Sequence, residues 1–254
     1  MSLYIETHGN GPDMVILHGW GLHGGLFGPV VERLAAHFRL HLVDLPGHGR
    51  SPMMKGGYTL EKVAETISEA VPDGAHWLGW SLGGRLALQA AASDAAIDKL
   101  ILVGSNPCFT QRTDWPHAMP ETELEQFAAS LRDNYKVTLQ RFLAVQSRGS
   151  ERAREELRNL RDSLFAHGEP DPQALAGGLE ILRDADLRPA LPGITQATLV
   201  LHGERDTLAP PAAAEYTATQ LPKGKLEVIE GAGHAPFISH PEAFVNAARN
   251  FIHD

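Results

Sequence analysis

The chain has 254 residues, of which 43% are hydrophobic and 21% charged, as expected of one globular domain with a sizeable core. Its formal charge of −9 argues against a nucleic acid as a general partner, because binding a nucleic-acid backbone needs clustered lysine and arginine. The single cysteine, Cys108, excludes an intramolecular disulfide framework, and no apolar run reaches the roughly 18 residues of a membrane-spanning helix, so we expect a cytoplasmic protein without membrane association.

Short apolar runs alternate with amphipathic stretches of helical length over most of the chain. This pattern predicts an α/β fold, in which crossover helices cover both faces of a mainly parallel, twisted sheet. Glycines and polar residues follow the predicted strands, and ligands of such sheets bind beyond the carboxyl ends of the strands. The predicted strands are residues 14–17, 39–43, 76–78, 99–103, 198–201 and 225–229.

The strand pattern is interrupted by a long insertion. Between the fourth and fifth predicted strands, the sequence predicts several helices broken at glycines and prolines. An insertion that follows a strand extends from the edge of the sheet where ligands bind. We therefore expect an α/β core formed by residues 1–110 and 189–254, covered by a helical cap of residues 111–188.

The third predicted strand leads into a candidate nucleophile. Gly79-Trp80-Ser81-Leu82-Gly83 fits the pattern Gly-x-Ser-x-Gly, and a predicted helix follows it. In this context the pattern indicates a nucleophile elbow, whose glycines keep side chains away while the serine hydroxyl projects above the sheet. The alternative is an ordinary turn, which the flanking strand and helix disfavour. We predict that Ser81 is the nucleophile.

A serine hydroxyl needs a base, and the base needs an orienting carboxylate. Among 13 histidines, His234 follows the last predicted strand in a Gly-Ala-Gly-His-Ala-Pro-Phe loop, and we predict that it is the base. Asp206 follows the preceding strand and is the predicted acid, with Glu204 as the nearest alternative. The histidine spacings suit no metal site, so we expect neither a metal nor a cofactor.

A tetrahedral oxyanion needs two preorganised N–H donors. One is predicted to be the backbone N–H of Leu82, directly after the nucleophile. The second is predicted to come from Trp20 in the His-Gly-Trp-Gly segment after the first strand. The alternative for this segment is a turn with a core tryptophan. His18 is interpreted as a residue that stabilises the turn, and the glycine-rich segment 44–51 as a structural loop.

Charge is unevenly distributed along the chain. Residues 132–161 contain eight basic and four acidic residues, so this stretch has a charge of +4 and the rest of the chain −13. A basic face on an acidic protein steers an acidic partner toward one side. The alternative interpretation is an ordinary solvated helix face.

Several longer segments resemble the pimeloyl-[acyl-carrier protein] methyl ester esterases of biotin synthesis. The resemblance runs from near the N-terminus to the last helix. The segments around Ser81 and His234 identify only the α/β-hydrolase superfamily, whereas the two segments inside the predicted cap are more discriminating. The matching segments are residues 18–22, 40–47, 77–84, 141–146, 177–182 and 234–241.

The resemblance implies hydrolysis of the methyl ester of pimeloyl-acyl-carrier protein with release of methanol, by a monomer that needs no cofactor. It also implies that the acyl-carrier protein docks on Arg141, Arg154 and Arg158 of the cap. A further family arginine near Lys136 and Val137 is not kept. The implied substrate contacts are Trp20, Ser81, Leu82, Phe142, Leu143, Ala144, Val145, Gln146 and His234, although position alone leaves Phe142 equally suited to the core of the cap.

Two other functions remain open at this point. The same scaffold supports a broad-specificity carboxylesterase or a hydrolase of carbon–carbon bonds, and it also supports a binding protein that senses a ligand without catalysis. The fold alone does not separate these functions. Hydrolysis of short esters compared with the carrier-bound ester, and labelling by a fluorophosphonate, would separate them.

Overall fold

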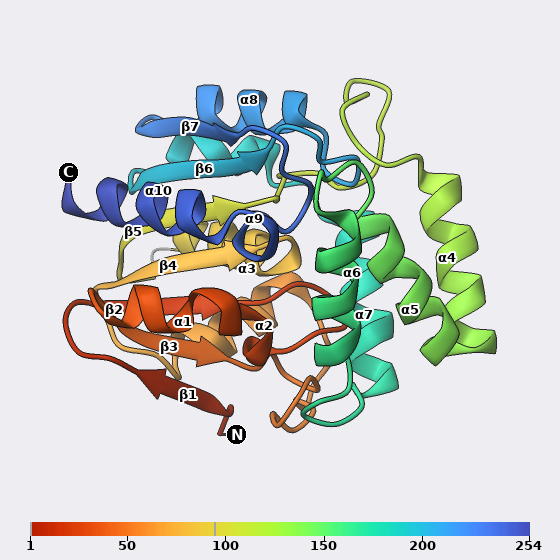
Figure 1. Ribbon diagram of the computed structural model, residues 1–254. Coiled ribbons are helices and arrows are strands. Elements are labelled where there is room, and N and C mark those ends of the chain that lie inside the picture. Colours follow the sequence, from red (N-terminus) through yellow and green to blue (C-terminus); the bar gives the residue numbers. More distant parts are fainter. Residues whose placement is uncertain (1, 94) are drawn as a thin grey trace.

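The computed structural model describes residues 2–93 and 95–254 and has a sheet of seven strands between two layers of helices (Figure 1). The strand order is β1-β3-β2-β4-β5-β6-β7, and each strand runs parallel to its neighbours except β1, which is antiparallel to β3. The predicted α/β class with a mainly parallel sheet is thus confirmed. The strands are β1 Ile5–His8, β2 Asp13–Leu17, β3 Arg39–Val43, β4 Ala75–Trp80, β5 Ile97–Val103, β6 Ala197–Gly203 and β7 Gly224–Ile229.

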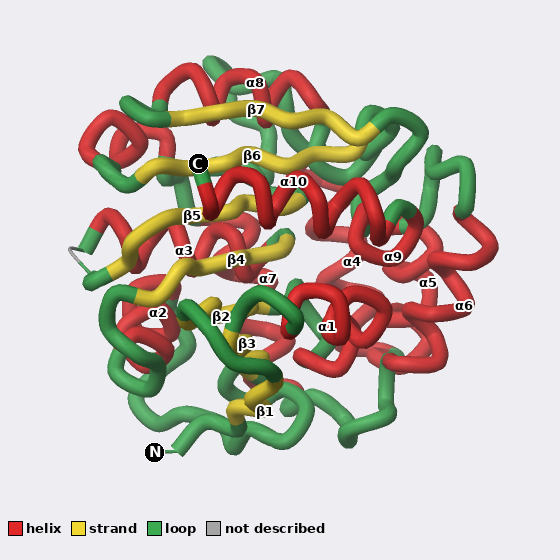
Figure 2. Tube along the Cα trace, turned by 60° about the vertical axis from the view of Figure 1, so that its left-hand side comes forward, coloured by secondary structure: helices red, strands yellow, loops and turns green. Residues whose placement is uncertain are grey.

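Helices cover both faces of the sheet. Helices α1 and α10 contact each other on one face, which Figure 2 shows from a second direction, while α2 and α3 pack together on the opposite face. Among the described residues, no helix has both the length and the apolar character needed to cross a bilayer. The helices of this core are α1 Gly28–Ala35, α2 Leu60–Ser68, α3 Leu82–Ala92, α8 Pro211–Gln220, α9 Pro236–Ser239 and α10 Pro241–His253.

The register of the central strands aligns their carboxyl ends. Leu17 pairs with Gly79, and Trp80 pairs with Val103. β4 is buried along its whole length, because its neighbours β2 and β5 cover both edges and helices cover both faces. The loops that leave β2, β4 and β5 therefore begin side by side at one edge of the sheet.

The edge strand β1 was not predicted. Its sequence, Ile-Glu-Thr-His, contains no apolar run, and its residues are half-buried or exposed. The strand is held by pairing with β3 and by Arg50, whose guanidinium bonds Glu6 at 2.8 Å. These partners lie 32 or more residues away, so a pattern confined to the strand could not reveal it.

Four helices are inserted between β5 and β6, beside the carboxyl ends of the strands (green to teal in Figure 1). Asn134 caps α5 by accepting the N–H of Val137, and Asp171 caps α7 by accepting the N–H of Gln173. We call residues 121–184 the helical insertion. Its helices are α4 Glu121–Asp133, α5 Tyr135–Gln146, α6 Ala153–Ser163 and α7 Pro172–Asp184.

Candidate active site

Ser81 occupies a strained turn between β4 and α3. Among the described residues it is the one non-glycine with a positive φ, +55°. Such a backbone costs about 1–3 kcal/mol and persists only where its surroundings hold it. The flanking glycines are needed because a Cβ at Gly79 would lie 2.4 Å from the carbonyl oxygen of Gly83, and one at Gly83 would lie 2.5 Å from that of Leu17. The turn therefore has the geometry of a nucleophile elbow.

Two hydrogen bonds hold the backbone of this turn against the end of β5. The N–H of Ser81 donates to the carbonyl of Val103 at 2.9 Å, and the hydroxyl of Ser105 donates to the carbonyl of Ser81 at 2.9 Å. On another side, a Cβ added to Gly19 would lie 3.3 Å from the Cβ of Ser81. The loop after β2 thus passes directly beside the serine.

Asp206 and His234 form a buried pair. Nδ1 of His234 lies 2.8 Å from Oδ2 of Asp206, and Oδ1 of Asp206 accepts the N–H groups of Leu208 and Ala209 at 2.9 Å each. Burial alone would raise the pKa of Asp206, but the charge and hydrogen bond of His234, with further help from His202, hold it below its usual value. The carboxylate is therefore ionised and fixes the orientation of the imidazole.

His234 also lies beside the segment that holds Ser81. A Cβ at Gly104 would lie 2.8 Å from the carbonyl oxygen of His234 and 3.2 Å from its Nδ1, and Val103 is the residue that binds the N–H of Ser81. The indole of Trp80 donates to the carbonyl of His234 at 2.8 Å. Nε2 of His234 is buried and has no hydrogen-bond partner among the described residues. This nitrogen is therefore available for a hydrogen bond with another group in the site.

Glu204, the alternative acid, does not reach His234. Its side chain is exposed, accepts the N–H of Gly231 at 3.0 Å and lies 3.6 Å from Arg205. It ties together the loops after β6 and β7. The structure thus brings Asp206, and not Glu204, to the histidine.

Trp20 packs against the helical insertion. Its indole N–H donates to the carbonyl of Leu175 at 2.9 Å, and its ring meets those of Phe127 and Phe142 edge-on, with centroids 5.3 Å apart in each case. Leu82 is the first residue of α3, and N–H groups in the first turn of a helix have no partner within it. The two predicted oxyanion donors therefore come from segments that flank Ser81.

His18 has a structural position. Its Nδ1 bonds the carbonyl of Gly19 at 2.8 Å, and its Nε2 accepts the N–H of Leu45 at 2.9 Å. Burial lowers its pKa to about 3, so the ring is neutral and both nitrogens are engaged in holding the turn. Asp44 likewise accepts backbone N–H groups from Gly24 and Arg50, which makes segment 44–51 a bonded loop.

The predicted substrate residues on α5 do not all face the same way. Phe142 and Gln146, one turn apart, are buried, and the amide nitrogen and oxygen of Gln146 have no partner within residues 2–93 and 95–254. Leu143 is also buried, Val145 is half-buried and Ala144 is exposed. Consecutive residues of a helix point in different directions, so only Phe142, Leu143 and Gln146 of this run are buried in the structure.

Two residues at the site were missed by the sequence analysis. Phe127 of α4 contacts both Trp20 and Phe142, and its apolar position in an amphipathic helix was the available signal. Asn106, three residues beyond β5, is buried, and its side-chain amide has no partner among the described residues. Its place after a strand end was a signal, but the loop around it carries no distinctive motif.

Arg141 on α5, together with Arg154 and Arg158 on α6, is exposed. None of the three forms an ion pair with a described residue, although the insertion contains other ion pairs such as Lys136 with Glu169. α5 and α6 pack against each other. The three guanidinium groups are thus displayed on adjacent helices.

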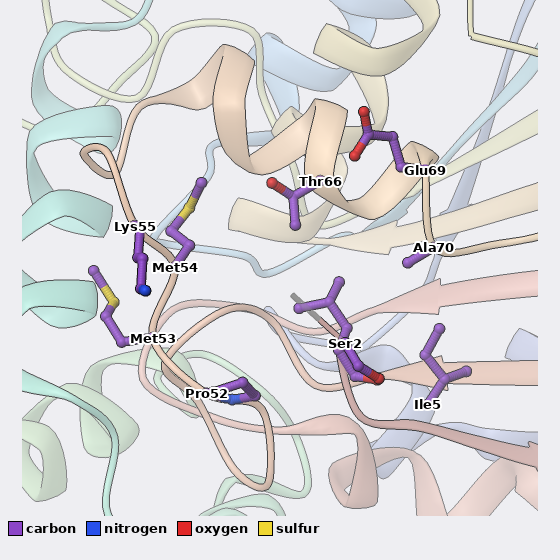
Figure 3. A pocket seen from close by; sticks show the side chains of 10 residues that line it. Ser2, Ile5, Pro52, Met53, Met54, Lys55, Thr66, Glu69 and Ala70 are labelled. Atoms are coloured by element: carbon purple, nitrogen blue, oxygen red, sulfur yellow. The ribbon is translucent and has the colours of Figure 1, made fainter.

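A surface hollow of about 920 Å³ lies elsewhere on the molecule, between the N-terminal segment, the loop 52–55 and α2 (Figure 3). Met53, Met54, Lys55 and Glu69 line it, and none of the predicted site residues does. No group of three or more potential metal ligands was found among the described residues.

Comparisons with known proteins complete this description. The family model described as "Alpha/beta hydrolase family" matches residues 14–248. The chain is 45% identical over 250 residues, 98% of each chain, to the pimeloyl-[acyl-carrier protein] methyl ester esterase of Xanthomonas oryzae pv. oryzae, and 44% identical over 252 residues, again 98% of each, to the esterase of that name from Xylella fastidiosa. Among solved structures, an esterase from Exiguobacterium antarcticum has a TM-score of 0.88 at 28% identity, covering 99% of this chain and 96% of its own.

Proposed function

The chain belongs to the alpha/beta hydrolase family, and from this we propose that it is a serine carboxylesterase that hydrolyses the methyl ester of pimeloyl-[acyl-carrier protein] to the free acid and methanol. The observation that carries the chemistry is the buried Asp206–His234 pair, with a free Nε2, beside the elbow of Ser81. The choice of ester rests on the 44–45% identity to esterases of that name over nearly the whole chain.

In the proposed reaction, His234 donates its Nδ1–H to Asp206, which leaves the lone pair of Nε2 to accept the proton of Ser81. The serine oxygen attacks the ester carbonyl. In this proposal the backbone N–H groups of Trp20 and Leu82 donate to the resulting oxyanion and stabilise it.

Collapse of this intermediate breaks the bond to the methoxy oxygen, and His234 returns its proton so that methanol leaves. Water then attacks the acyl-enzyme, with His234 again accepting a proton. The second tetrahedral intermediate collapses, the carboxylic acid is released, and Ser81 is restored. No metal or cofactor is required in this cycle.

We propose that the helical insertion acts as a cap over this site. The proposed division of the chain is a core of residues 1–110 and 189–254 and a cap of residues 111–188, which contains the helical insertion. Ser81 is only 8% exposed and His234 1%. Phe142 of the insertion meets the ring of Trp20 edge-on, and Gln146, one turn further along α5, has a buried amide without a partner among the described residues. In this proposal the cap limits access to Ser81, and the unpaired amide of Gln146 is available to bond the substrate.

The acyl-carrier protein that bears the substrate is the proposed partner. Its docking surface consists of Arg141, Arg154 and Arg158, whose guanidinium groups are exposed and unpaired among the described residues. Attraction to this face and repulsion from the rest of an acidic chain orient the carrier toward the cap. Neither a nucleic acid nor a membrane is part of the proposal, and we predict a monomer working in the cytoplasm.

The test compares two substrates with purified protein. Methyl pimeloyl-acyl-carrier protein should lose one CH₂ in mass and release methanol, with a higher kcat/KM than short p-nitrophenyl esters, while Ser81→Ala should bind the carrier without turnover. Hydrolysis of the short esters alone would instead identify a broad carboxylesterase. A protein that neither turns over nor reacts with a fluorophosphonate would be a ligand-binding member of the family.

A further inference from the structure

Arg85 is a buried arginine on the nucleophile helix α3, one helical turn after Ser81. Its side chain is 1% exposed and ends among carbonyl groups. The guanidinium donates to the carbonyl of Ala185 at 2.6 Å, of Asn106 at 3.1 Å and of Ile181 at 3.4 Å. No carboxylate lies within salt-bridge distance of it in the part of the chain that is described. A buried charge without a paired opposite charge is rare in folded proteins.

The acceptors of Arg85 explain how the charge is tolerated. Ile181 and Ala185 lie at the C-terminal end of α7, where the helix dipole is negative. The carbonyl of Ile181 also accepts the N–H of Ala185, so the short bond to the carbonyl of Ala185 is the main cap that Arg85 provides. Burial lowers the pKa of Arg85 to about 10, so the guanidinium keeps its proton at neutral pH. The residue therefore caps a helix of the insertion from a helix of the core.

The helix that Arg85 caps also holds Trp20. The carbonyl of Leu175 in α7 accepts the indole N–H of Trp20 at 2.9 Å. One turn further along, a Cβ at Gly178 would lie 2.6 Å from the ring of Trp20 and 3.6 Å from the side chain of Leu82. The backbone of α7 thus rests directly on both proposed oxyanion residues, so a shift of α7 moves Trp20.

We propose that Arg85 is a positioning residue for the hydrolysis: it fixes the C-terminal end of α7 to the nucleophile helix and so keeps Trp20 in register with Ser81. This inference rests on the proposed function, because it gives Trp20 a task in the reaction. Arg85 itself touches neither the substrate nor the reacting atoms. Its third acceptor, the carbonyl of Asn106, ties the loop after β5 to the same point.

The test uses Arg85→Met, which keeps the length of the side chain and removes its donors, and Arg85→Lys, which keeps a charged donor. Arg112→Gln is the matched control, because Arg112 also donates to the end of α7, at the carbonyl of Arg183, but from a segment outside α3. We expect Arg85→Met to lower kcat about 10²-fold, the order of loss caused by a misplacement of about 1 Å, with little change in KM. Arg85→Lys should have a kcat between that of Arg85→Met and that of the unchanged enzyme. Arg112→Gln should have a kcat close to that of the unchanged enzyme.

Each rate is measured well below the unfolding temperature of the variant, and hydrogen exchange of residues 172–184 is measured in parallel. Faster exchange in α7 of Arg85→Met, together with the fall in kcat, supports the inference. Unchanged exchange, or a kcat equal to that of the unchanged enzyme, overturns it.

If the unchanged enzyme hydrolyses no ester, the proposed function fails, while the exchange data still decide whether Arg85 anchors α7. Should Arg85→Met not fold, Arg85→Gln, which keeps one donor, takes its place.

Discussion

The two oxygens of the Asp206 carboxylate have different tasks: Oδ2 lies 2.8 Å from Nδ1 of His234, while Oδ1 accepts the N–H groups of Leu208 and Ala209. One oxygen orients the imidazole and the other shapes the turn after β6. These two tasks can be separated by mutation, because an amide side chain keeps one carbonyl oxygen but replaces the other with an N–H donor.

Asp206→Asn should therefore lower kcat by about 10⁴-fold while the unfolding temperature changes little, since the amide oxygen still caps the turn and the amide N–H opposes the required tautomer of His234. Asp206→Ala should lower both quantities. Ester hydrolysis and thermal unfolding of the two variants check this. Glu204→Gln is the control and should retain the full rate, because Glu204 faces Gly231 and Arg205. A fast Asp206→Asn variant would remove Asp206 from the proposed triad.

Gly178 offers a direct test of the contact between α7 and Trp20. A methyl group at this position would lie 2.6 Å from the indole, so Gly178→Ala should displace either the ring or the helix. We expect a lower kcat and a loss of about 1–3 kcal/mol in the free energy of unfolding, the usual cost of overpacking. Gly193→Ala serves as the control, because nothing lies within 4 Å of its added methyl group. Equal rates for the two variants would show that the position of Trp20 does not limit turnover.

The proposed docking surface predicts an effect confined to the carrier-bound substrate. Arg154→Glu and Arg158→Glu should each raise KM for methyl pimeloyl-acyl-carrier protein by about tenfold, as expected for the loss of a charge contact of roughly 1.4 kcal/mol, and should leave hydrolysis of p-nitrophenyl esters unchanged. The wild-type KM should rise with salt because exposed charges are screened.

Arg39→Glu is the matched control for docking. Arg39 is also exposed, but it begins β3 at the end of the sheet opposite the helical insertion. If this variant weakens carrier binding as much as Arg154→Glu, net charge rather than a local surface explains the effect.

The sequence was most informative where function depends on local geometry. The elbow around Ser81 needs glycines at fixed positions, and Asp206 follows β6, which is a buried apolar run. His234 follows β7, in which apolar and charged residues are mixed, and the glycine-rich loop around the histidine was the clearer signal. The register of parallel strands then brings these loops to one edge. β1 was not predicted because it is stabilised by pairing with β3, whereas its own sequence contains no apolar run.

Contacts between segments that are distant along the chain could not be predicted from the sequence. Arg85 lies in a stretch of good helix formers, and nothing local indicates that it is buried, because its acceptors at Ile181 and Ala185 are about one hundred residues away. The local sequence favours an exposed position for Arg85, but the helical insertion packs over this residue and buries it. The same limit applies to Phe127, which reaches Trp20 only when α4 packs against the core.

His48 predicts how stability depends on pH. The ring is buried, which lowers its pKa from 6.5 to about 4, and its Nδ1 bonds the carbonyl of Pro46 at 3.0 Å. Between pH 6.5 and about 4, His48 is therefore protonated in the unfolded chain but neutral in the folded chain. Acidification over this window should cost about 1.4 kcal/mol of stability per pH unit for this histidine, whereas above pH 6.5 the group is neutral in both states and contributes no slope.

His48→Asn should remove this part of the slope, because asparagine keeps a donor at the position of Nδ1 and does not titrate. Urea unfolding at several pH values between 6.5 and about 4 measures the free energy of both proteins. Relative to His48→Asn, the unchanged protein should lose stability as the pH falls, since only it loses the contribution of His48. His18, whose pKa burial lowers to about 3, remains in both proteins and leaves a residual slope. Parallel curves would mean that His48 takes up its proton in the folded state, and hence that its ring is open to water.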